Sequence, residues 1–361
     1  MSHHQLISGL VERGAITADW QEAFLQVPRE RFVPERIWIG PTADREVDRA
    51  EDPSGWAQAV ASDIPVVTHR DESGTPTSSC SMPYMVATML RHLDVHPGQR
   101  VLEIGTGTGW NAALLAHRNG SEQVTSIEVD PLVAAAAERA LTSLGLQPHL
   151  VVADGQLGAP EGGLFDRIIA TCAVQNIPVT WLEQLAPGGI LVAPFATTFH
   201  NGVLLRLSGE DLGRASGTVV DDAQFMAMTG HAWHRDVMAW VTNEAAAKTD
   251  LTWLDPRHLH DLDFAFTAGL HLPGVIRSFG YGHGASEGEM TAWLAHPDTG
   301  SWASADYAPG QEEFTTSHHG SRDLWTELEG IYRDWFEQGK PSRTSYQVTA
   351  TSAGTRIHLA G

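Results

Sequence analysis

The stretch Val101-Leu-Glu-Ile-Gly-Thr-Gly-Thr-Gly109 decides the fold that this sequence predicts. Residues 100–104 form a short, mainly apolar strand pattern, and Gly105, Gly107 and Gly109 follow where that strand would end. Glycines at this spacing let the main chain turn sharply and let a ligand approach the bare backbone beside a helix start. A glycine-rich loop alone is a weak signal, because dinucleotide-binding proteins carry a similar one.

Acidic residues near the loop indicate which class of ligand the loop would bind. Glu103 precedes the loop by two residues and suits an ammonium group better than a pyrophosphate, and the spacing is GxGxG, not GxGxxG. Glu128 ends the next predicted strand, where a carboxylate can accept both hydroxyls of a ribose. Asp154 and Gly155 follow the third strand, at a position suited to an adenine edge. These residues indicate a nucleoside ligand with an amino group; a glycine turn with incidental surface acids is the alternative.

Strand and helix patterns alternate around the loop. Strands are expected over residues 100–104, 123–129, 149–153, 165–171 and 190–194, and helices over 111–117, 131–144 and 178–185. Strands joined by single helices imply parallel pairing with right-handed crossovers, so the predicted fold class is α/β with a doubly wound, Rossmann-like sheet. Residues 202–207 and 217–220 are expected to finish the sheet as an antiparallel pair.

The region before the loop is expected to be a helical segment followed by irregular chain, with an exposed acidic loop over residues 41–55. A helix is predicted over residues 83–93, and the polar stretch Thr77-Ser-Ser-Cys-Ser-Met-Pro-Tyr-Met85 runs into it. Its small side chains could offer hydroxyls near the carboxyl edge of the sheet. A Ser/Thr turn with a helix cap is the alternative.

After Met228 the alternation stops, and residues 231–361 are expected to form an additional C-terminal α+β domain. A helix over 323–338 and a hairpin from 344 to 359 are its clearest elements. The predicted domains are therefore residues 1–230 and residues 231–361. The tryptophans of the second domain are expected to be mostly core or interface residues, with a minority available for a peptide-docking groove.

Composition limits the partners. The 361 residues include 44 acidic and 23 basic side chains, and the resulting net charge of −21 repels nucleic-acid phosphates and anionic membranes. No apolar run approaches the roughly 18 residues that span a bilayer, and the first residues lack the features of a signal peptide. A soluble, cytoplasmic protein without a nucleic-acid or membrane partner is therefore expected.

Cysteine and histidine usage gives no metal site. Cys80 and Cys172 are far apart in the sequence, and each is expected to be a small packed residue and not a nucleophile. The closest histidines lie in three groups without a Cys/His framework or an HExxH helix. These groups are His231 with His234, His258 with His260, and His318 with His319.

Several motifs, in the right order, resemble those of the protein-L-isoaspartate O-methyltransferases. They are residues 27–34, 82–89, 101–109, 165–171, 177–178, 187–192 and 224–228, so the resemblance covers about residues 5 to 230. It implies a class I methyltransferase fold and S-adenosylmethionine as cofactor. The predicted cofactor-binding residues are Glu103, Gly105, Thr106, Gly107, Gly109, Glu128, Asp154, Gly155 and Thr171.

The same resemblance assigns the catalytic residues. Ser81 matches the family's serine beside the methyl acceptor, and Ser79 matches its threonine. A carboxylate is already nucleophilic at neutral pH, so these hydroxyls would orient the acceptor and no strong base is needed. Two segments that help form the family's peptide-binding cleft depart from its pattern. Ser78-Ser-Cys-Ser-Met82 replaces Gln-Thr-Ile-Ser followed by Ala or Gln, and Phe225-Met-Ala replaces Phe-Val-Pro.

The C-terminal extension resembles that of methyltransferases that accompany ribosomally made peptides such as lanthipeptides, graspetides and lasso peptides. Those enzymes esterify an aspartate in a constrained peptide, and the ester closes to an aspartimide that can hydrolyse to isoaspartate. The leading hypothesis is therefore aspartate O-methylation of a modified precursor peptide, with the extension recognising that peptide. The alternatives are repair of isoaspartate in damaged proteins and a non-catalytic, cofactor-bound peptide-binding protein.

Overall fold

The computed structural model describes residues 2–230 and 236–360, so His231, Trp233 and His234 lie outside the described residues. The chain forms two compact units. The first comprises Met1–Phe195, Leu204–Gly230 and Val348–Arg356, and the second comprises Ala196–Val203, His231–Gln347 and Ile357–Gly361. The last part of the chain therefore contributes to both units.

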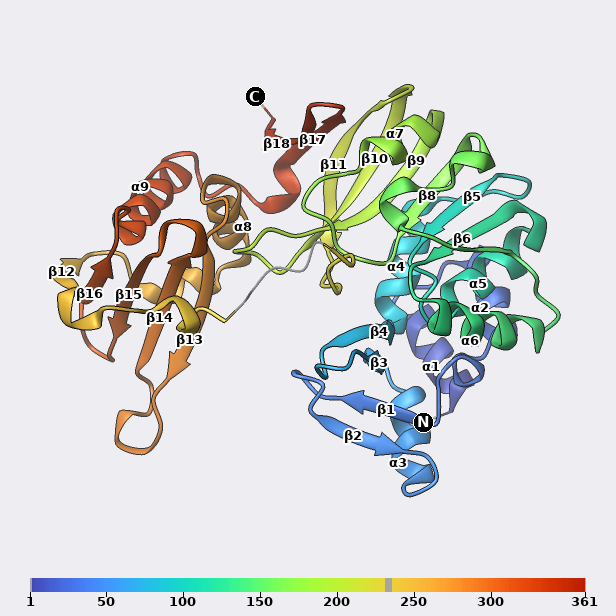
Figure 1. Cartoon of the computed structure of the whole chain (residues 1–361), viewed down its shortest axis with the longest axis horizontal. Helices are drawn as coiled ribbons and strands as arrows, with labels where there is room; N and C mark the ends of the chain where they lie inside the picture. The colour runs from blue at the N-terminus through green and yellow to red at the C-terminus, as the bar shows by residue number, and fades with distance from the viewer. Residues whose placement is uncertain (1, 231–235, 361) are drawn as a thin grey trace. The chain divides into compact units, whose positions relative to one another are not determined.

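A nine-stranded sheet with the order β18-β17-β11-β10-β9-β8-β5-β6-β7 forms the centre of the first unit (Figure 1). β5 pairs in parallel with β6 and with β8, β6 with β7, and β8 with β9. This confirms the predicted doubly wound α/β sheet. The strands are β5 (Val101–Ile104), β6 (Val124–Glu128), β7 (His149–Val152), β8 (Phe165–Ala170), β9 (Leu185–Phe195), β10 (Val203–Asp211), β11 (Arg214–Asp222), β17 (Tyr346–Thr351) and β18 (Gly354–Leu359).

Helices cover this sheet because apolar side chains recur along one side of each. In α4 (Pro83–Leu93), Val86, Leu90 and Leu93 are buried, and they join one hydrophobic cluster with α1 (His3–Glu12), α2 (Ala18–Gln26) and α5 (Trp110–Asn119). β5 lies in the interior, with all four of its residues buried, as expected of a central parallel strand. The remaining helices are α6 (Pro131–Thr142) and α7 (Val179–Gln184).

Local capping sets where α6 begins. The Asp130 side chain accepts hydrogen bonds from the backbone N–H groups of Leu132 (2.8 Å) and Val133 (3.3 Å), and Pro131 occupies the first helical turn. Both features favour a helix start directly after β6. The cap also fixes the short link between Glu128, the last residue of β6, and the helix.

The region between residues 36 and 80 differs from the expected irregular chain, because it forms a four-stranded antiparallel sheet with the order β2-β1-β3-β4. The supposed loop over 41–55 contains a strand and a helix start, and the Ser-rich stretch is itself a strand. These strands escaped the sequence pattern because they are only four or five residues long, and β2 and β4 consist mostly of charged or small polar residues. They are β1 (Arg36–Ile39), β2 (Arg45–Asp48), β3 (Val66–Arg70) and β4 (Pro76–Cys80). The helix α3 (Pro53–Val60) lies between β2 and β3 in the chain.

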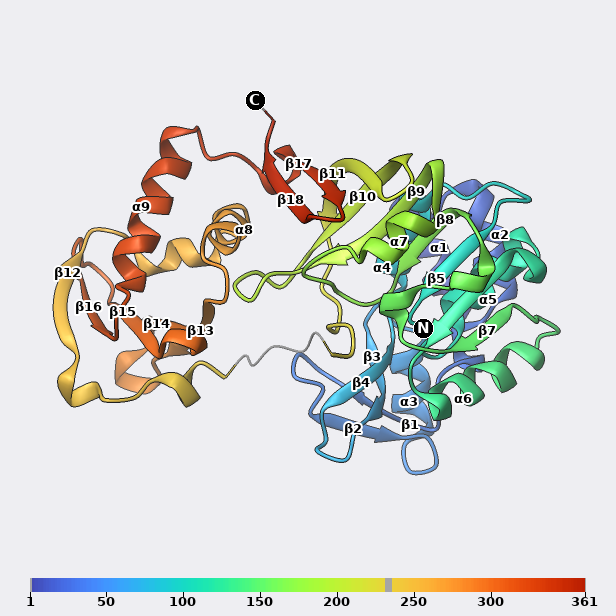
Figure 2. The same ribbon diagram turned by 45° about the horizontal axis from the view of Figure 1, so that its top comes forward.

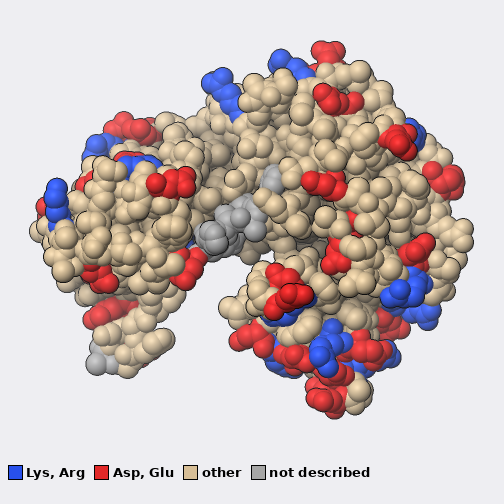
Figure 3. Space-filling view, viewed as in Figure 1, with Lys and Arg blue, Asp and Glu red and all other residues tan. Residues whose placement is uncertain are grey.

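Opposite charges face each other across β1 and β2. Arg36 lies 3.2 Å from Glu46 and 3.4 Å from Asp48, and Lys and Arg are interspersed with Asp and Glu over this sheet in Figure 3. Cross-strand pairs of this kind each stabilise a sheet by a fraction of 1 kcal/mol, about 0.2–1 kcal/mol in other proteins. The pairs therefore explain part of the high charge of this region without requiring a charged partner.

The second unit contains a five-stranded antiparallel sheet with the order β12-β16-β15-β14-β13, which confirms an additional α+β region. Phe264, Trp325 and Tyr332 form part of its core, and Trp302 lies in a second cluster. Its elements are β12 (Lys248–Thr252), β13 (Ile276–Tyr281), β14 (Met290–His296), β15 (Ser301–Tyr307), β16 (Phe314–His319), α8 (Leu262–His271) and α9 (Leu324–Glu337).

Within the described ranges, no group of three or more His, Cys, Asp or Glu side chains is arranged to hold a metal ion. Two of the histidines singled out by spacing pack on aromatic rings: His258 stacks on Tyr332 at 4.8 Å and His260 lies 4.3 Å from Phe279. None of the helices in the described part of the chain combines the length and apolar character that crossing a membrane requires.

Candidate active site

The strand order indicates where a ligand binds. The chain passes from β5 to β6 on one side and later enters β8 on the other side of β5. In open α/β sheets, ligands bind at the carboxyl edge in the crevice where the strand order reverses. The crevice here lies between the loop after β5, residues 105–109, and the loop after β8, residues 171–178.

The first loop requires its glycines. Gly105, Gly107 and Gly109 have φ angles of +92°, +54° and +86°, a region that other residues rarely adopt. A Cβ atom on Gly105 would lie 2.7 Å from Thr171 Oγ1, and one on Gly109 would lie 3.1 Å from Ala137 Cβ. The loop is therefore a backbone surface that side chains cannot cover at these positions.

The Thr171 hydroxyl joins the two walls of the crevice. It donates to the carbonyl of Gly105 at 2.5 Å and also lies 3.2 Å from the carbonyl of Ile104. The backbone N–H of Thr171 donates to Ile104 as well. Thr171 thus couples the loop after β8 to the glycine loop.

Glu103 lies beneath the glycine loop and is fully buried. Its Oε1 accepts a hydrogen bond from Asn111 Nδ2 at 2.7 Å, and its Oε2 accepts one from the Ser126 hydroxyl. That hydroxyl also lies 2.6 Å from Thr106 Oγ1, and Thr106 is itself only 5% exposed. Both Glu103 and Thr106 are therefore part of a buried polar network that supports the loop.

Burial has an electrostatic consequence for Glu103. Loss of hydration raises the pKa of this carboxyl to about 7, the nearby Glu128 acts in the same direction, and the bonds from Ser126 and Asn111 act against both. Asn111 Oδ1 is buried and has no hydrogen-bond partner among the described residues. The network can therefore still accept one further hydrogen bond at this atom.

Glu128 lies at the carboxyl end of β6, beside the glycine loop. Its Oε2 accepts a hydrogen bond from the Gly107 N–H at 2.8 Å, and its Oε1 accepts from the N–H groups of Val129 and Asp130 at 3.0 and 3.1 Å. The carboxylate is half-buried and retains lone pairs for further donors. Its placement fits the predicted contact with ribose hydroxyls.

Asp154 and Gly155 lie directly after β7 on the same edge. Asp154 Oδ1 accepts from the Gln156 N–H at 2.9 Å, and a Cβ atom on Gly155 would lie 2.7 Å from Ile104 Cγ2. Close packing against β5 therefore requires glycine at position 155. Val129 and Leu157 on this edge are 45% and 53% exposed, which suits the apolar faces of an adenine ring.

The Ser-rich strand β4 runs beside the glycine loop. A Cβ atom on Gly107 would lie 3.5 Å from Ser78 Oγ and 3.6 Å from the carbonyl oxygen of Ser79. Ser79 and Ser81 are half-buried residues, and neither hydroxyl makes a hydrogen bond within residues 2–230 and 236–360. Both remain available to a bound acceptor.

Arg29 holds this strand and was missed by the sequence analysis. Its side chain is 1% exposed, and its guanidinium donates to the carbonyls of Cys80 (2.7 Å), Ser81 (3.0 Å) and Ile64 (2.8 Å). It also donates to Val60, and its Nε lies 3.3 Å from Cys80 Sγ. The sequence contained this residue within the matching motif at 27–34 but did not show that it is buried, since arginine is rarely buried.

A second missed contact lies where β3 and β4 approach β6. His69 Nδ1 is 2.7 Å from the Thr77 hydroxyl and 4.0 Å from Asp130 Oδ2. The β3–β4 hairpin therefore reaches the residues that follow Glu128. Spacing alone could not indicate this contact, because it joins two different sheets.

Neither cysteine has the environment of a nucleophile. Burial, with Glu128 as a further cause, raises the pKa of Cys172 to about 12, so its thiol is neutral at physiological pH. Cys80 is 1% exposed and packed against Arg29.

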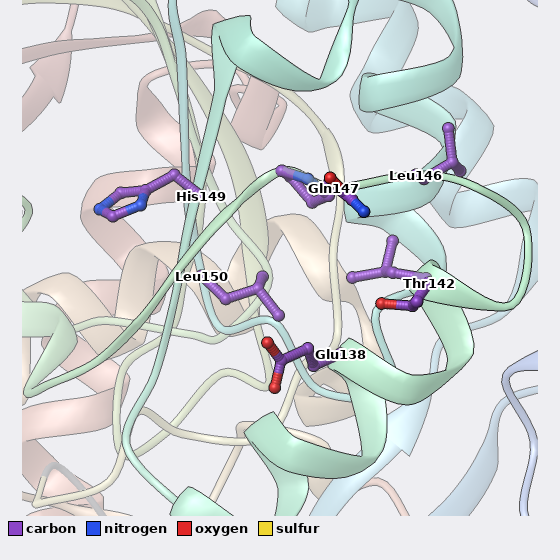
Figure 4. Close-up of a pocket in the computed structure, with 8 residues that line it drawn as sticks. Glu138, Thr142, Leu146, Gln147, His149 and Leu150 are labelled. Atoms are coloured by element: carbon purple, nitrogen blue, oxygen red, sulfur yellow. The ribbon is translucent and has the colours of Figure 1, made fainter.

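A cavity of 340 Å³ lies elsewhere, between α6 and β7 (Figure 4). None of the residues expected to bind the cofactor or the acceptor lines it. Its lining consists of Glu138, Leu141, Thr142, Leu146, Gln147, Pro148, His149 and Leu150.

The crevice fits S-adenosylmethionine. The backbone at Gly107 is bare next to β4, Glu128 is bonded to this loop and retains lone pairs for further donors, and Asn111 Oδ1 in the buried network beneath the loop has no partner among the described residues. Together with the doubly wound sheet, these features define a class I S-adenosylmethionine-dependent methyltransferase.

Comparison with known proteins identifies the family. The family model "Protein-L-isoaspartate(D-aspartate) O-methyltransferase (PCMT)" matches residues 1–232. A protein-L-isoaspartate O-methyltransferase of Methanosarcina mazei is 33% identical over 234 residues, covering 64% of this chain and 84% of the relative. One of Hyperthermus butylicus is 30% identical over 252 residues, covering 67% and 94%. The chain belongs to the protein-L-isoaspartate O-methyltransferase family of S-adenosylmethionine-dependent carboxyl O-methyltransferases, which confirms the resemblance.

Solved structures agree on the fold. A structure named protein-L-isoaspartate O-methyltransferase superposes with a TM-score of 0.57 and 21% identity, covering 99% of this chain and 100% of that one. A beta-aspartate methyltransferase from Plasmodium falciparum, in complex with S-adenosyl-L-homocysteine, gives a TM-score of 0.50 and 20% identity over 63% of this chain and 98% of that one. The first match extends through the C-terminal region.

Proposed function

We propose that this protein methylates the side-chain carboxylate of isoaspartyl residues in proteins or peptides. The observation that carries the proposal is the position of β4 beside Gly107, because Ser79 lies on this strand and Ser81 directly follows it. Membership in a family of carboxyl methyltransferases supports a carboxylate as the acceptor.

Each of the predicted cofactor-binding residues would make a different contact, according to its position in the crevice. Glu128 would accept the ribose hydroxyls, and Asp154 and Gly155 would lie beside the adenine. Gly105, Gly107 and Gly109 would offer bare backbone, while Glu103 and Thr106 would support the loop from below through Ser126. Thr171 would keep both walls of the crevice together.

The acceptor residues would act by orientation. S-adenosylmethionine supplies a methyl group on a sulfonium, and its transfer to a carboxylate oxygen gives a methyl ester and S-adenosylhomocysteine. Ser81 and Ser79 would donate hydrogen bonds to the acceptor and hold its carboxylate in line with the methyl group. Correct orientation can supply a large share of the acceleration, about 7–11 kcal/mol in well-aligned intramolecular reactions. Arg29 would fix the backbone from which Ser81 projects.

A second candidate is aspartate esterification in a constrained, ribosomally made peptide. The observation that favours it is the altered segment at 225–228, where the Met226 carbonyl accepts from Ala173 N–H in the loop after β8. Met226 and Ala227 stand where the family pattern has Val and Pro, so this wall could suit another acceptor. The extension does not favour either candidate, because a structure named for isoaspartate methylation matches it in fold.

The second unit is assigned a role in peptide recognition under either candidate. Trp253, Tyr281 and Phe336 are 47%, 58% and 57% exposed. Exposed aromatic side chains are enriched where proteins bind peptides. Alanine substitution of these three residues should raise the KM for a peptide acceptor and leave cofactor affinity unchanged.

The test uses three peptides of one sequence: linear with isoaspartate, linear with aspartate, and macrocyclic with aspartate. Methyl ester formation from S-adenosylmethionine is followed by mass spectrometry, and cofactor binding by calorimetry. Fastest methylation of the isoaspartyl peptide is expected. Preference for the macrocyclic peptide would replace the first candidate by the second. Cofactor binding without turnover on any peptide would contradict both and indicate a non-catalytic peptide-binding protein.

A further inference from the structure

The end of the chain completes the methyltransferase sheet. After Gly230 the chain leaves the first unit, and it returns to that unit with Val348–Arg356. There β17 pairs beside β11 and β18 forms the edge of the nine-stranded sheet (Figure 2). In sequence, the main part of the second unit, His231–Gln347, thus lies between two parts of the first.

The beginning of β18 contacts the loop after β8. Thr355 Oγ1 accepts a hydrogen bond from the backbone N–H of Ile177 at 2.8 Å, and the Thr355 N–H lies 3.4 Å from Asn176 Oδ1. Gly354 has a φ of +114°, which lets the chain turn close to Asn176. All of these residues belong to the first unit.

Other backbone hydrogen bonds hold residues 171–174, the beginning of this loop. Thr171 N–H donates to Ile104 at 2.9 Å, Ala173 exchanges backbone hydrogen bonds with Met226 and Met228, and Val174 N–H donates to Pro194 at 3.0 Å. Ile177 is only 3% exposed, and its N–H donates to Thr355 alone among the described residues. Loss of the Thr355 hydroxyl would leave this buried donor without a partner, which is destabilising.

We propose that Thr355 is a positioning residue for the methyl acceptor site, acting through residues 171–178. This inference rests on the proposed function, because the loop forms the wall of the crevice opposite the glycine loop. Thr355 does not touch the reacting groups; it fixes the far end of the wall whose near end is held by Thr171. The C-terminal hairpin is therefore part of the catalytic unit.

The test compares Thr355→Val, Thr355→Ser and Thr349→Val in the full-length protein. Valine keeps the shape of threonine but loses the acceptor, serine keeps the acceptor, and Thr349 on β17 makes no side-chain hydrogen bond in the described structure. Hydrogen exchange at the Ile177 amide should be about tenfold faster in Thr355→Val, the factor for one ordinary hydrogen bond. The serine variant should restore slow exchange, and the Thr349 variant should not change it.

Kinetics provide the second readout. Thr355→Val should lower kcat/KM for the acceptor peptide about tenfold, with an unchanged Kd for S-adenosylhomocysteine and recovery in Thr355→Ser. Unchanged exchange at Ile177 would overturn the contact itself. Faster exchange with wild-type kcat/KM would overturn the positioning role. A wild-type protein inactive on every peptide would instead contradict the proposed function, and the exchange experiment would still decide the contact.

Discussion

The two sides of the crevice differ in how fully their polar groups are paired. On the cofactor side, Glu103, Thr106 and Glu128 are each bonded to neighbouring groups before any ligand binds. On the side that we propose for the acceptor, the hydroxyls of Ser79 and Ser81 make no hydrogen bond within the described residues, and Arg29 holds the backbone of Ser81. Under the proposed function, this difference corresponds to a preformed cofactor site and an acceptor site that is completed by its substrate.

The largest expected effect concerns the hydrogen-bonded cofactor side of the crevice, and it is a change in the free energy of unfolding. Because the folded-state pKa of Glu103 is raised from 4.5 to about 7, the folded protein retains a proton that the unfolded chain releases between these pH values. The free energy of unfolding should therefore fall as pH rises from 4.5 to 7, by up to about 3 kcal/mol. Glu103→Gln should remove this contribution.

Urea unfolding of wild type and Glu103→Gln at pH 4.5 and pH 8 measures the effect. The variant should gain stability relative to wild type at the higher pH, because it has no carboxylate to ionise in the buried network. Exposed carboxyls contribute equally to both proteins and cancel in the difference. An equal difference in the free energy of unfolding at both pH values would show that the network holds Glu103 without a raised pKa.

The next effect tests the unpaired side. Ser81→Ala should lower kcat about 100-fold, because loss of one orienting hydrogen bond misaligns the acceptor, while the Kd for S-adenosylhomocysteine should not change. Ser54→Ala is the control, since the Ser54 hydroxyl on α3 bonds to Asp52 at 3.0 Å and does not line the glycine loop. A wild-type kcat for Ser81→Ala would remove Ser81 from the acceptor site.

A smaller effect is expected when the backbone of β4 is held less firmly but both serine hydroxyls are kept. Arg29→Lys cannot reach the carbonyls of Cys80, Ser81 and Ile64 together, so kcat should fall about tenfold and stability by about 2 kcal/mol. Arg167→Lys is the control, because Arg167 is also buried but donates to Asp94, away from β4. If both variants lose stability and keep kcat, Arg29 supports the fold without positioning Ser81.

Local patterns account for what the sequence could predict. The glycine loop, Glu128 and strand β8 were predictable because each depends on residues close together in the chain, and an apolar strand followed by glycines has few other interpretations. The hairpin at the end of the chain was likewise predicted. Its place at the edge of the large sheet was not, because pairing between β17 and β11 leaves no local signal.

Long-range contacts account for what was missed. Arg29 and Cys80 are 51 residues apart, and Ile177 and Thr355 are 178 residues apart, so no spacing rule connects them. The sequence predicted Glu103 beside the ligand's ammonium group, and that contact stays a prediction. The sequence did not indicate that Glu103 is buried beneath the loop with both oxygens bonded, because burial depends on packing between distant parts of the chain.

A crystal structure of the full-length protein with S-adenosylhomocysteine and an isoaspartyl peptide would locate both ligands. We expect the nucleoside between residues 105–109 and 171–178, with Glu128 on the ribose and the peptide carboxylate within hydrogen-bond distance of Ser81 Oγ. A nucleoside bound away from the glycine loop, or a carboxylate that does not reach β4, would contradict this placement.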